Sequence, residues 1–383
     1  MKHWAVLLFS TMLAACGTLP ALQPPEHLFN DALFAAPDER IDADDVFALS
    51  PEMRRYLATE IAAEEVGKGG QQALFNALYA RGQLRLEYAS DMTRNAAQAF
   101  AARSGNCLSL VIMTAAFARE MDLSVRFQQV YVDETLGRSG DVYLSIGHVN
   151  VTLGNRYAYA GSQHREGDSL TIDFLPPAEI RGLRARVIGE KTIVAMYMNN
   201  RAVEALAAGR LDDAYWWARA AIGQDARFAS AYNTLGVVYQ QHGNLAEADR
   251  ALTYALARDP RSAPAMSNLV AVLKAQGRAA EAAEMGARLA RLEPNPPFAF
   301  FNRGVAAMRA GDHRTAKEMF AKEVDRAPYF HEFHFWLGAA HAALGEHDQA
   351  RAHLAKALQF SSQAADRQLY AAKLERIATT RTQ

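Results

Sequence analysis

The chain has 383 residues, 22% of them charged, and a formal net charge of −1 at pH 7. This balance excludes the basic field that attracts nucleic acid, so no nucleic-acid partner is expected. The length suits two or three domains of ~150 residues each. Only two cysteines are present, Cys16 and Cys107, which excludes a fold held by several disulfides.

The start of the chain has the pattern of an export signal. Lys2 precedes an apolar run over residues 4–8, which is shorter than the ~20 residues of a membrane-spanning helix. A positive start, a short apolar run and small residues before a cleavage point are typical of a secretory signal peptide. We therefore expect residues 1–15 to be removed and residues 16–30 to form a linker.

Cys16 ends the sequence Leu-Ala-Ala-Cys over residues 13–16. This tetrapeptide resembles the bacterial lipobox, and the resemblance implies that Cys16 receives a diacylglyceryl group that anchors the mature chain in a membrane. Gly17 stands where inner-membrane lipoproteins carry an aspartate, so the resemblance implies the outer membrane, facing the periplasm. The alternative is an ordinary cleaved signal with a chance cysteine.

Residues 31–190 are expected to form one α+β domain. Apolar residues recur at helical spacing up to Met121. Runs rich in β-branched and aromatic residues then alternate as strands do, over residues 124–132, 141–153, 156–160 and 169–175. Helices followed by strands are typical of an α+β domain with an antiparallel sheet.

Cys107 follows Gly105 and Asn106 and precedes an apolar run over residues 108–117. Gly105 permits a tight turn, Ser104 or Asn106 can cap, and the run predicts a buried helix that begins at the cysteine. The free N–H groups of a first helical turn favour the thiolate, which is the nucleophilic form of cysteine. The alternative is a buried and inert cysteine.

Two residues further along the chain complete a set of three. His148 lies within a predicted strand, and Asp173 lies near the end of a later one. A cysteine at a helix start, a strand histidine and a strand aspartate, within residues 93–177, resemble the transglutaminase-like superfamily of cysteine hydrolases. The resemblance implies that Cys107 is the nucleophile, His148 the general base and acid, and Asp173 the group that orients the imidazole. It also implies action on peptide or isopeptide bonds without a cofactor.

The chain departs from that superfamily at two places beside the predicted site. Asn150 stands where an aromatic residue is usual, and Phe-Leu-Pro-Pro follows Asp173 where Pro-Thr is usual. Neither change removes a reactive group. Both alter the walls of the site, so the substrate does not follow from the resemblance.

Other polar clusters are weaker candidates for a site. His331, His334 and His341 share a helical face by their spacing, but no carboxylate or cysteine completes a metal-binding set. His164 and Asp168 lie in a polar stretch, and the Gly-Lys-Gly-Gly sequence at 67–70 has the wrong spacing for a phosphate-binding loop. We therefore expect neither a metal ion nor a cofactor.

A repeat of 34 residues fills the C-terminal half. Its marks are the glycines Gly209, Gly243, Gly277, Gly311 and Gly345, the alanines Ala214, Ala248, Ala282, Ala316 and Ala350, and the prolines Pro260, Pro294 and Pro328. A glycine allows the positive φ of a turn between two helices. A small alanine allows the second helix to pack closely on the first.

This pattern resembles the tetratricopeptide repeat, a helical hairpin, in five units over residues 195–364. Residues 365–383 are expected to form a capping helix, with Leu369, Leu374 and Ile377 among its apolar positions. Because each unit of such an array contacts only its neighbours, the repeat half is expected to fold without the N-terminal half.

The resemblance implies a concave groove that binds a protein or peptide. Asn200, Asn268 and Asn302 hold one position in three units, where the family often binds peptide backbone or carboxylate. The alternative is that asparagine is simply common there. An apolar stripe in the fourth unit predicts either a groove floor or packing against the next repeat: Phe298, Phe301, Val305 and Met308.

Three functions are compatible with these patterns. The first is a hydrolase, or a transferase if an amine replaces water as the acceptor; hydrolysis is favoured because water needs no binding site of its own. The second is a catalytically inactive scaffold of an envelope complex. The third is a peptide-binding module whose N-terminal domain only caps the repeats.

Overall fold

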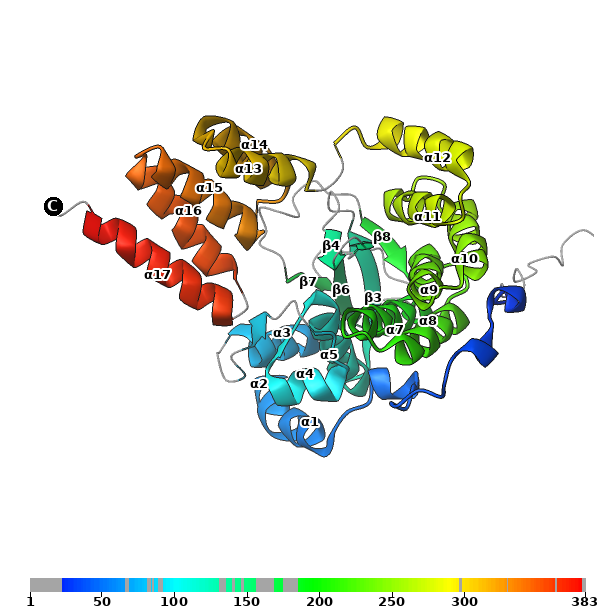
Figure 1. Ribbon diagram of the computed structural model, residues 1–383. Coiled ribbons are helices and arrows are strands. Elements are labelled where there is room, and N and C mark those ends of the chain that lie inside the picture. Colours follow the sequence, from blue (N-terminus) through cyan, green and yellow to red (C-terminus); the bar gives the residue numbers. More distant parts are fainter. Residues whose placement is uncertain are drawn as a thin grey trace, which may run out of the picture.

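The computed structural model describes residues 23–65, 69–80, 84, 86–88, 92–130, 136–139, 142–145, 148–155, 169–174, 185–295, 298–328, 330–361 and 364–380. An N-terminal part is built around one sheet, and a series of helices arches over it (Figure 1). The predicted signal peptide, Cys16 and Gly17 lie outside the described residues. No helix in the described part of the chain is long and apolar enough to cross a membrane.

The N-terminal part begins with short helices and helical turns. They are η1 (Glu26–Leu28), η2 (Asp31–Leu33), η3 (Asp44–Val46), α1 (Pro51–Tyr56), η4 (Leu57–Ile61), α2 (Ala62–Glu65), α3 (Gly70–Phe75), η5 (Asn76–Ala80), α4 (Ala96–Ala102) and α5 (Cys107–Glu120), with β1 (Glu87–Tyr88) and β2 (Ser104–Gly105) between them. Local capping residues determine where several of these helices begin. Ser50 caps α1 by accepting from the backbone N–H of Met53 at 3.2 Å, and Asn95 with Gln98 forms a capping box at α4.

The main sheet is antiparallel, with strands in the order β7-β6-β3-β8. It contains β3 (Leu123–Val130), β6 (His148–Asn155), β7 (Ser169–Ile172) and β8 (Ala185–Ile188), and a separate hairpin holds β4 (Leu136–Ser139) and β5 (Val142–Ser145). The strands of this sheet and of the hairpin follow the helices and are antiparallel, as predicted, whereas β1 and β2 form a short parallel pair among the helices. The sequence does not predict β8, because only Ile188 of this edge strand is buried and no alternation marks it.

The C-terminal half folds as five helical hairpins and a final helix, as predicted. The helices are α7 (Glu190–Ala207), α8 (Leu211–Gln224), α9 (Ala229–His242), α10 (Leu245–Arg258), α11 (Ala263–Ala275), α12 (Ala279–Leu292), α13 (Ala299–Arg309), α14 (His313–Arg326), α15 (His331–Ala343), α16 (His347–Phe360) and α17 (Ala364–Thr380). The five repeat glycines all have positive φ, between 73° and 89°. The five repeat alanines are buried, at most 3% exposed. Both physical expectations from the repeat pattern are confirmed.

The final helix meets only part of its prediction. Leu374 and Ile377 of α17 are partly buried, and Tyr370 is 3% exposed. Leu369, another of the apolar positions, is 45% exposed. Leu369 directly precedes the buried Tyr370, and neighbouring residues on a helix point about 100° apart.

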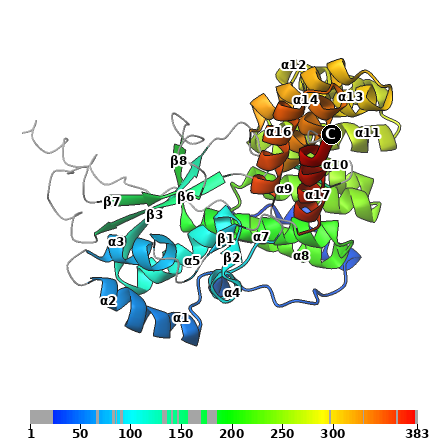
Figure 2. The ribbon, with the colours of Figure 1, turned by 90° about the vertical axis from the view of Figure 1, so that its left-hand side faces the viewer.

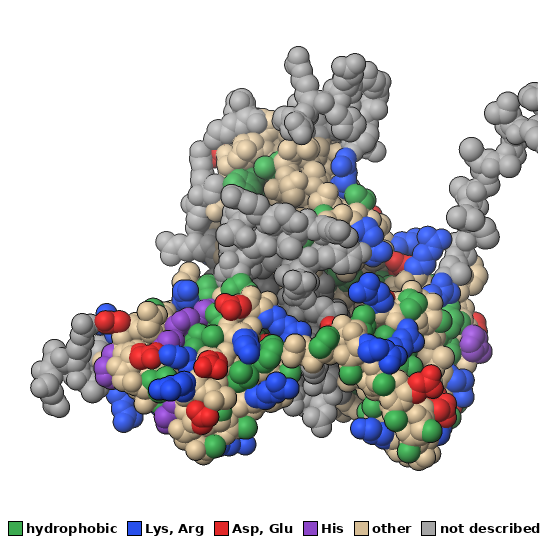
Figure 3. Space-filling view, turned by 90° about the horizontal axis from the view of Figure 1, so that it is seen from above, with side chains coloured by type: hydrophobic (Ala, Val, Ile, Leu, Met, Phe, Trp, Pro, Cys, Tyr) green, Lys and Arg blue, Asp and Glu red, His purple; other side chains and the backbone are tan. Residues whose placement is uncertain are grey.

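Two separate cores divide the hairpins into two groups. One core runs from Leu28 through the N-terminal part to Ala282 of α12, and the other joins Ala316, Phe320, Leu337 and Ala340. We call α7–α12 the first array and α13–α17 the second array. They stand apart in the ribbon, and they form two lobes when the molecule is viewed from above (Figures 1 and 3).

One substitution accompanies the separation of the arrays. Leu235, Leu269 and Leu337 hold the same repeat position in three hairpins, each at most 4% exposed. The fourth hairpin has Arg303 there, and its side chain is exposed. A guanidinium requires water or an anionic partner. The apolar position that the second, third and fifth hairpins bury is therefore missing at the start of the second array, and also in the first hairpin, which has Arg201 there.

A strap, residues 23–47, runs along the first array and connects it to the N-terminal part (Figure 2). The Tyr239 hydroxyl accepts from the backbone N–H of Asn30 and donates to the carbonyl of Leu28, both at 2.9 Å. The ring of Phe34 stacks on Tyr215 with centroids 4.0 Å apart.

These contacts bear on two predictions. Residues 23–30, the described part of the predicted linker, pack against the repeats, because Tyr239 is bonded to their backbone. The expectation that repeats contact only their neighbours is wrong for the first array, whose core continues into the strap and the N-terminal part.

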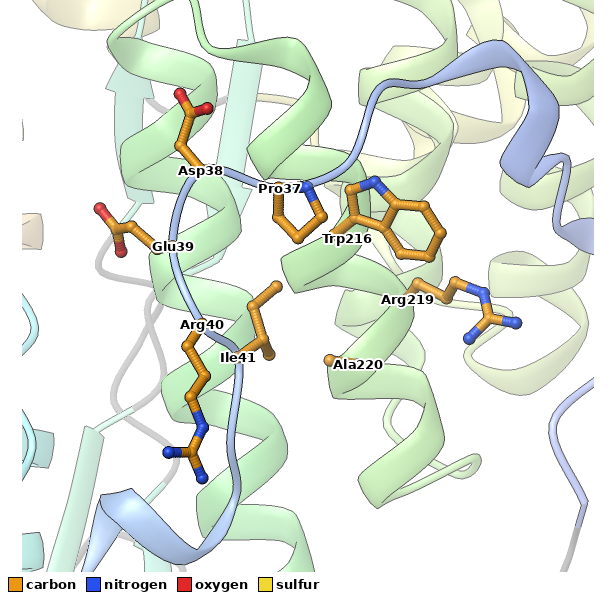
Figure 4. Close-up of a pocket in the computed structure, with 8 residues that line it drawn as sticks. All are labelled: Pro37, Asp38, Glu39, Arg40, Ile41, Trp216, Arg219 and Ala220. Carbon is orange, nitrogen blue, oxygen red and sulfur yellow. The ribbon is translucent and has the colours of Figure 1, made fainter.

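The strap and α8 also enclose a shallow hollow of about 370 Å³ (Figure 4). Pro37, Ile41 and Trp216 form apolar walls, while the carboxylates of Asp38 and Glu39 point away from the indole. Because these polar groups do not converge on the hollow, it is a seam between two packed segments and lacks the features of a ligand site.

Candidate functional site

Cys107 is the first residue of α5, as predicted, and its thiol is free and buried. Asn106 is the cap: its Oδ1 accepts from the backbone N–H of Ser109 at 2.9 Å and from the Ser109 hydroxyl at 2.8 Å. Gly105 is needed because Ser109 packs closely against it, and not for a positive φ. A Cβ at position 105 would lie 2.6 Å from the Cβ of Ser109. These contacts set where the helix begins and therefore where the sulfur lies.

His148 and Asp173 lie on neighbouring strands. His148 begins β6, and Asp173 directly follows β7, which pairs with β6. The imidazole Nε2 donates to Oδ1 of Asp173 at 2.7 Å, and both side chains are 6% exposed. Cys107 lies close enough to His148 to raise the pKa of the imidazole. Because Nε2 faces the carboxylate, Nδ1 is the nitrogen left for the sulfur. The structure thus brings the three predicted residues together.

The neighbours of His148 decide its charge. Burial by itself would lower the pKa of His148, because it disfavours the imidazolium. The hydrogen bonds to Asp173 and Cys107 act in the opposite direction and raise the pKa of His148 to about 9. The raised pKa favours the protonated imidazole at neutral pH. A cysteine beside an imidazole that a carboxylate orients is chemically capable of nucleophilic acyl transfer.

Asn150 is a site residue that the sequence did not identify. Its Nδ2 donates to Oδ2 of Asp173 at 2.9 Å, and its side chain is 6% exposed. The sequence marked Asn150 only as a departure from the transglutaminase-like pattern. Strand alternation is the signal that would have found it, because residues 148 and 150 of β6 share one face.

The second departure from the transglutaminase-like pattern begins at Phe174, whose ring makes a packing contact behind the site. The ring of Phe174 packs against Tyr79 of η5 with centroids 5.4 Å apart, and the Tyr79 hydroxyl is hydrogen-bonded to Thr114 of α5. The end of β7 is thus tied to the helix that carries Cys107. Residues 156–168 and 175–184 lie outside the described residues, and with them His164, Asp168 and the Leu-Pro-Pro that follows Phe174; residues 67–68 do so too.

A buried threonine joins the cap of α5 to the first repeat helix. The Thr93 hydroxyl accepts from Nδ2 of Asn106 at 2.8 Å and from Nδ2 of Asn200 at 3.2 Å. The backbone N–H of Thr93 donates to Oε1 of Glu204 at 2.6 Å. Asn200 and Glu204 both belong to α7. The first repeat is therefore part of the support of the site, and the structure places Asn200 against the N-terminal part.

The other two predicted groove residues lie in different surroundings. Asn268 is 4% exposed, and its Nδ2 donates to Oδ1 of Asn233 at 2.9 Å within the first array. Asn302, on α13, has an exposed side chain. Strand β5 lies beside α9 and α11, so the chain's own hairpin occupies this side of the first array. The fourth-unit stripe packs inside the second array, where Phe301 contacts Phe320 with ring centroids 5.8 Å apart.

The second array carries six of the eleven histidines of the chain (Figure 3). His334 is bonded to His353 at 3.0 Å and to the Pro328 carbonyl at 2.7 Å, whereas His331 is bonded to Tyr370 at 2.8 Å and His341 to Glu346. Each histidine of the weak metal candidate thus has a partner of its own. Within the described residues, no group of three or more His, Cys, Asp or Glu side chains is placed to hold a metal ion.

Comparisons with known proteins support the repeats. The tetratricopeptide-repeat family model matches residues 233–297 and 301–365. The two matched segments lie on either side of the separation between the arrays. The C-terminal half is an all-helical tetratricopeptide-repeat solenoid.

Several solved structures are similar to part of the chain. YrrB, described as a tetratricopeptide-repeat protein with an unusual peptide-binding site, is 23% identical over 47% of this chain and 92% of its own, with a TM-score of 0.26. PilF of Pseudomonas aeruginosa is 23% identical over 51% and 88%, with a TM-score of 0.31. TTC0263 of Thermus thermophilus is 20% identical over 47% and 98%, with a TM-score of 0.30. No curated protein matches the chain.

Proposed function

We propose that this chain is a cysteine hydrolase of the bacterial cell envelope that cleaves peptide or isopeptide bonds through a thioester on Cys107. One observation carries the proposal: Nε2 of His148 is bonded to Asp173 at 2.7 Å, and Cys107 lies close enough to the same imidazole to raise its pKa. The order of the three residues, and their places on a helix start and two strands, resemble the transglutaminase-like superfamily. Hydrolysis is favoured over transfer because an amine acceptor needs a binding site of its own.

In the proposed reaction, the Cys107 sulfur attacks the carbonyl carbon of the substrate amide, and a C–S bond replaces the C–N bond. His148 gives a proton to the departing amine, and Asp173 keeps the imidazole in place. Water then attacks the thioester carbonyl and gives a proton to His148 as the sulfur leaves. The products are a carboxylic acid and an amine, and the thiolate and the imidazolium are restored.

Tetratricopeptide repeats bind proteins or peptides, and we assign this role to the second array. The first array already contacts the strap and β5 of its own chain. The second array has a core of its own and presents Asn302 with an exposed side chain. In this proposal, a protein held by the second array is delivered to a site on the same chain.

The proposal includes a lipid anchor at Cys16 and an outer-membrane location facing the periplasm. The anchor rests on the Leu-Ala-Ala-Cys sequence over residues 13–16, and the outer-membrane location rests on Gly17. Replacing Cys16 with Ser should release the protein from the membrane pellet into the soluble envelope fraction. A Cys16→Ser variant that stays in the pellet contradicts the anchor.

Alkylation with iodoacetamide at pH 6, followed by intact mass, tests the site. An ordinary thiol is protonated at this pH and reacts slowly, whereas a thiolate beside an imidazolium reacts quickly. We expect His148→Ala to slow alkylation of Cys107 by at least about tenfold, and Asp173→Ala to slow it less, because a misplaced imidazole still accepts protons. The Cys107→Ser variant is the control, because any alkylation that it shows occurs at other residues. Equal rates in the wild type and both variants overturn the hydrolase and leave the inactive scaffold.

A further inference from the structure

We infer that Asn150 is a positioning residue, whose side-chain amide fixes the Asp173 carboxylate so that one oxygen faces His148. This inference rests on the proposed function. His148, Asn150 and Thr152 share one face of β6, and each is at most 7% exposed. Asp173 receives a separate donor on each oxygen: Nε2 of His148 on Oδ1 at 2.7 Å, and Nδ2 of Asn150 on Oδ2 at 2.9 Å.

Two hydrogen-bond donors hold this carboxylate in place more firmly than one donor does. With the imidazole alone, the carboxylate of Asp173 can turn about its last bond and carry the imidazole away from the sulfur. A second donor on the other oxygen opposes that rotation. It also stabilises the negative charge in a place where water is excluded. Partners at this distance from the reacting atoms commonly orient the groups that do the chemistry.

Packing alone does not account for an asparagine at position 150. Its own Oδ1 is buried and finds no partner among the described residues. A buried acceptor without a partner destabilises the fold, whereas a leucine of similar size would not. The opposite face of β6 shows the apolar choice, because Val149, Val151 and Leu153 are fully buried there. The amide N–H toward Asp173 is the favourable contact that the asparagine provides.

A double-mutant cycle on Cys107 alkylation at pH 6 tests the inference. We expect Asn150→Ala to slow alkylation about tenfold, the effect of losing a hydrogen bond to a charged group. In the Asp173→Ala background, Asn150→Ala should change the rate by less than about twofold, because Asn150 acts only through Asp173. Given a wild-type thiol that reacts faster than that of His148→Ala, the inference fails if Asn150→Ala reacts like the wild type, or if it slows the Asp173→Ala variant by the same factor.

Thr152→Val is the matched control. Thr152 lies two residues further along the same face of β6, and its hydroxyl is bonded to that of Thr171 on β7 at 2.9 Å. This variant loses a buried bond between the same two strands without touching Asp173. We expect it to alkylate at the wild-type rate. A loss equal to that of Asn150→Ala would assign the effect to strand pairing and overturn the inference.

A second readout separates this inference from the proposed function. The Nε2 proton of His148, bonded to Asp173, should give a downfield NMR signal that is absent in His148→Gln. We expect Asn150→Ala to broaden or shift that signal and Thr152→Val to preserve it. If the signal responds in this way while the wild-type thiol reacts no faster than that of His148→Ala, the positioning holds and the hydrolase fails. An unchanged signal in Asn150→Ala overturns the positioning.

Discussion

The two arrays are built from the same repeat but are covered in different ways. The first array shares one core with the N-terminal part, and Tyr239 binds the backbone of the strap. The second array has a separate core around Phe320 and Leu337. A repeat pattern therefore predicts the hairpins, but it does not predict what lies against them. The first array is part of the support of the candidate site.

The largest expected difference between the two arrays comes from replacing two leucines that hold the same repeat position. Leu252 and Leu354 are at most 2% exposed, and each lies against a glycine in the first helix of its own hairpin, Gly236 for Leu252 and Gly338 for Leu354. Replacing either with Ala should cost about 2–5 kcal/mol. Hydrogen exchange read by mass spectrometry should show that Leu252→Ala also loosens the strap and α5, because these share its core. The loss in Leu354→Ala should stay within α13–α17. Equal loosening of α5 in both variants contradicts the division.

The two regions should respond to pH in opposite directions. In the second array, burial and then the charges of His334, His341 and Lys356 lower the pKa of His353 to about 4. The unfolded chain, with an ordinary histidine pKa of about 6.5, binds that proton more readily. This contribution to stability is present above pH 6.5 and is lost as the pH falls toward 4. His148, raised to about 9, behaves oppositely: its contribution is present below pH 6.5 and is lost as the pH rises toward 9.

Thermal and denaturant unfolding at pH 5, 7 and 9 checks these signs. His353→Gln should reduce the loss of stability between pH 7 and 5, and His148→Gln should reduce the loss between pH 7 and 9. Each effect should be about 1–3 kcal/mol. A His353→Gln variant that is as acid-sensitive as the wild type would show that this histidine does not limit the second array.

The smallest expected effect comes from a variant that tests how the strap is held on the first array. Tyr239→Phe removes the hydroxyl that serves both Asn30 and Leu28, leaving two backbone groups without that partner. We expect a cost of about 1–2 kcal/mol and faster proteolysis of the strap. Tyr232→Phe is the control, because the Tyr232 hydroxyl donates to the Ala226 carbonyl within the first array. If both variants leave the strap equally resistant to protease, the tyrosine is not what holds it.

Much of the candidate site could be predicted from the sequence. A lone buried thiol at a helix start, a strand histidine and a later strand aspartate predicted a set that the structure brings together. Their catalytic role remains a proposal. Asn150 was missed because a departure from a family pattern does not say which neighbour the new side chain meets. Asn200 was assigned to the groove because repeat position alone does not reveal its bond to Thr93.

The sequence by itself determined the local structure of this protein. Periodic glycines and alanines specify the hairpins, and Asn106 and Gly105 specify where α5 begins, because turns, caps and close helix packing act over a few residues. Only the tertiary structure decided which surfaces meet. The pairing of β6 with β7, the strap on Tyr239 and the bond from Thr93 to α7 join residues far apart in the chain. Such contacts depend on how whole surfaces fit together, and the sequence pattern near each residue does not encode that fit.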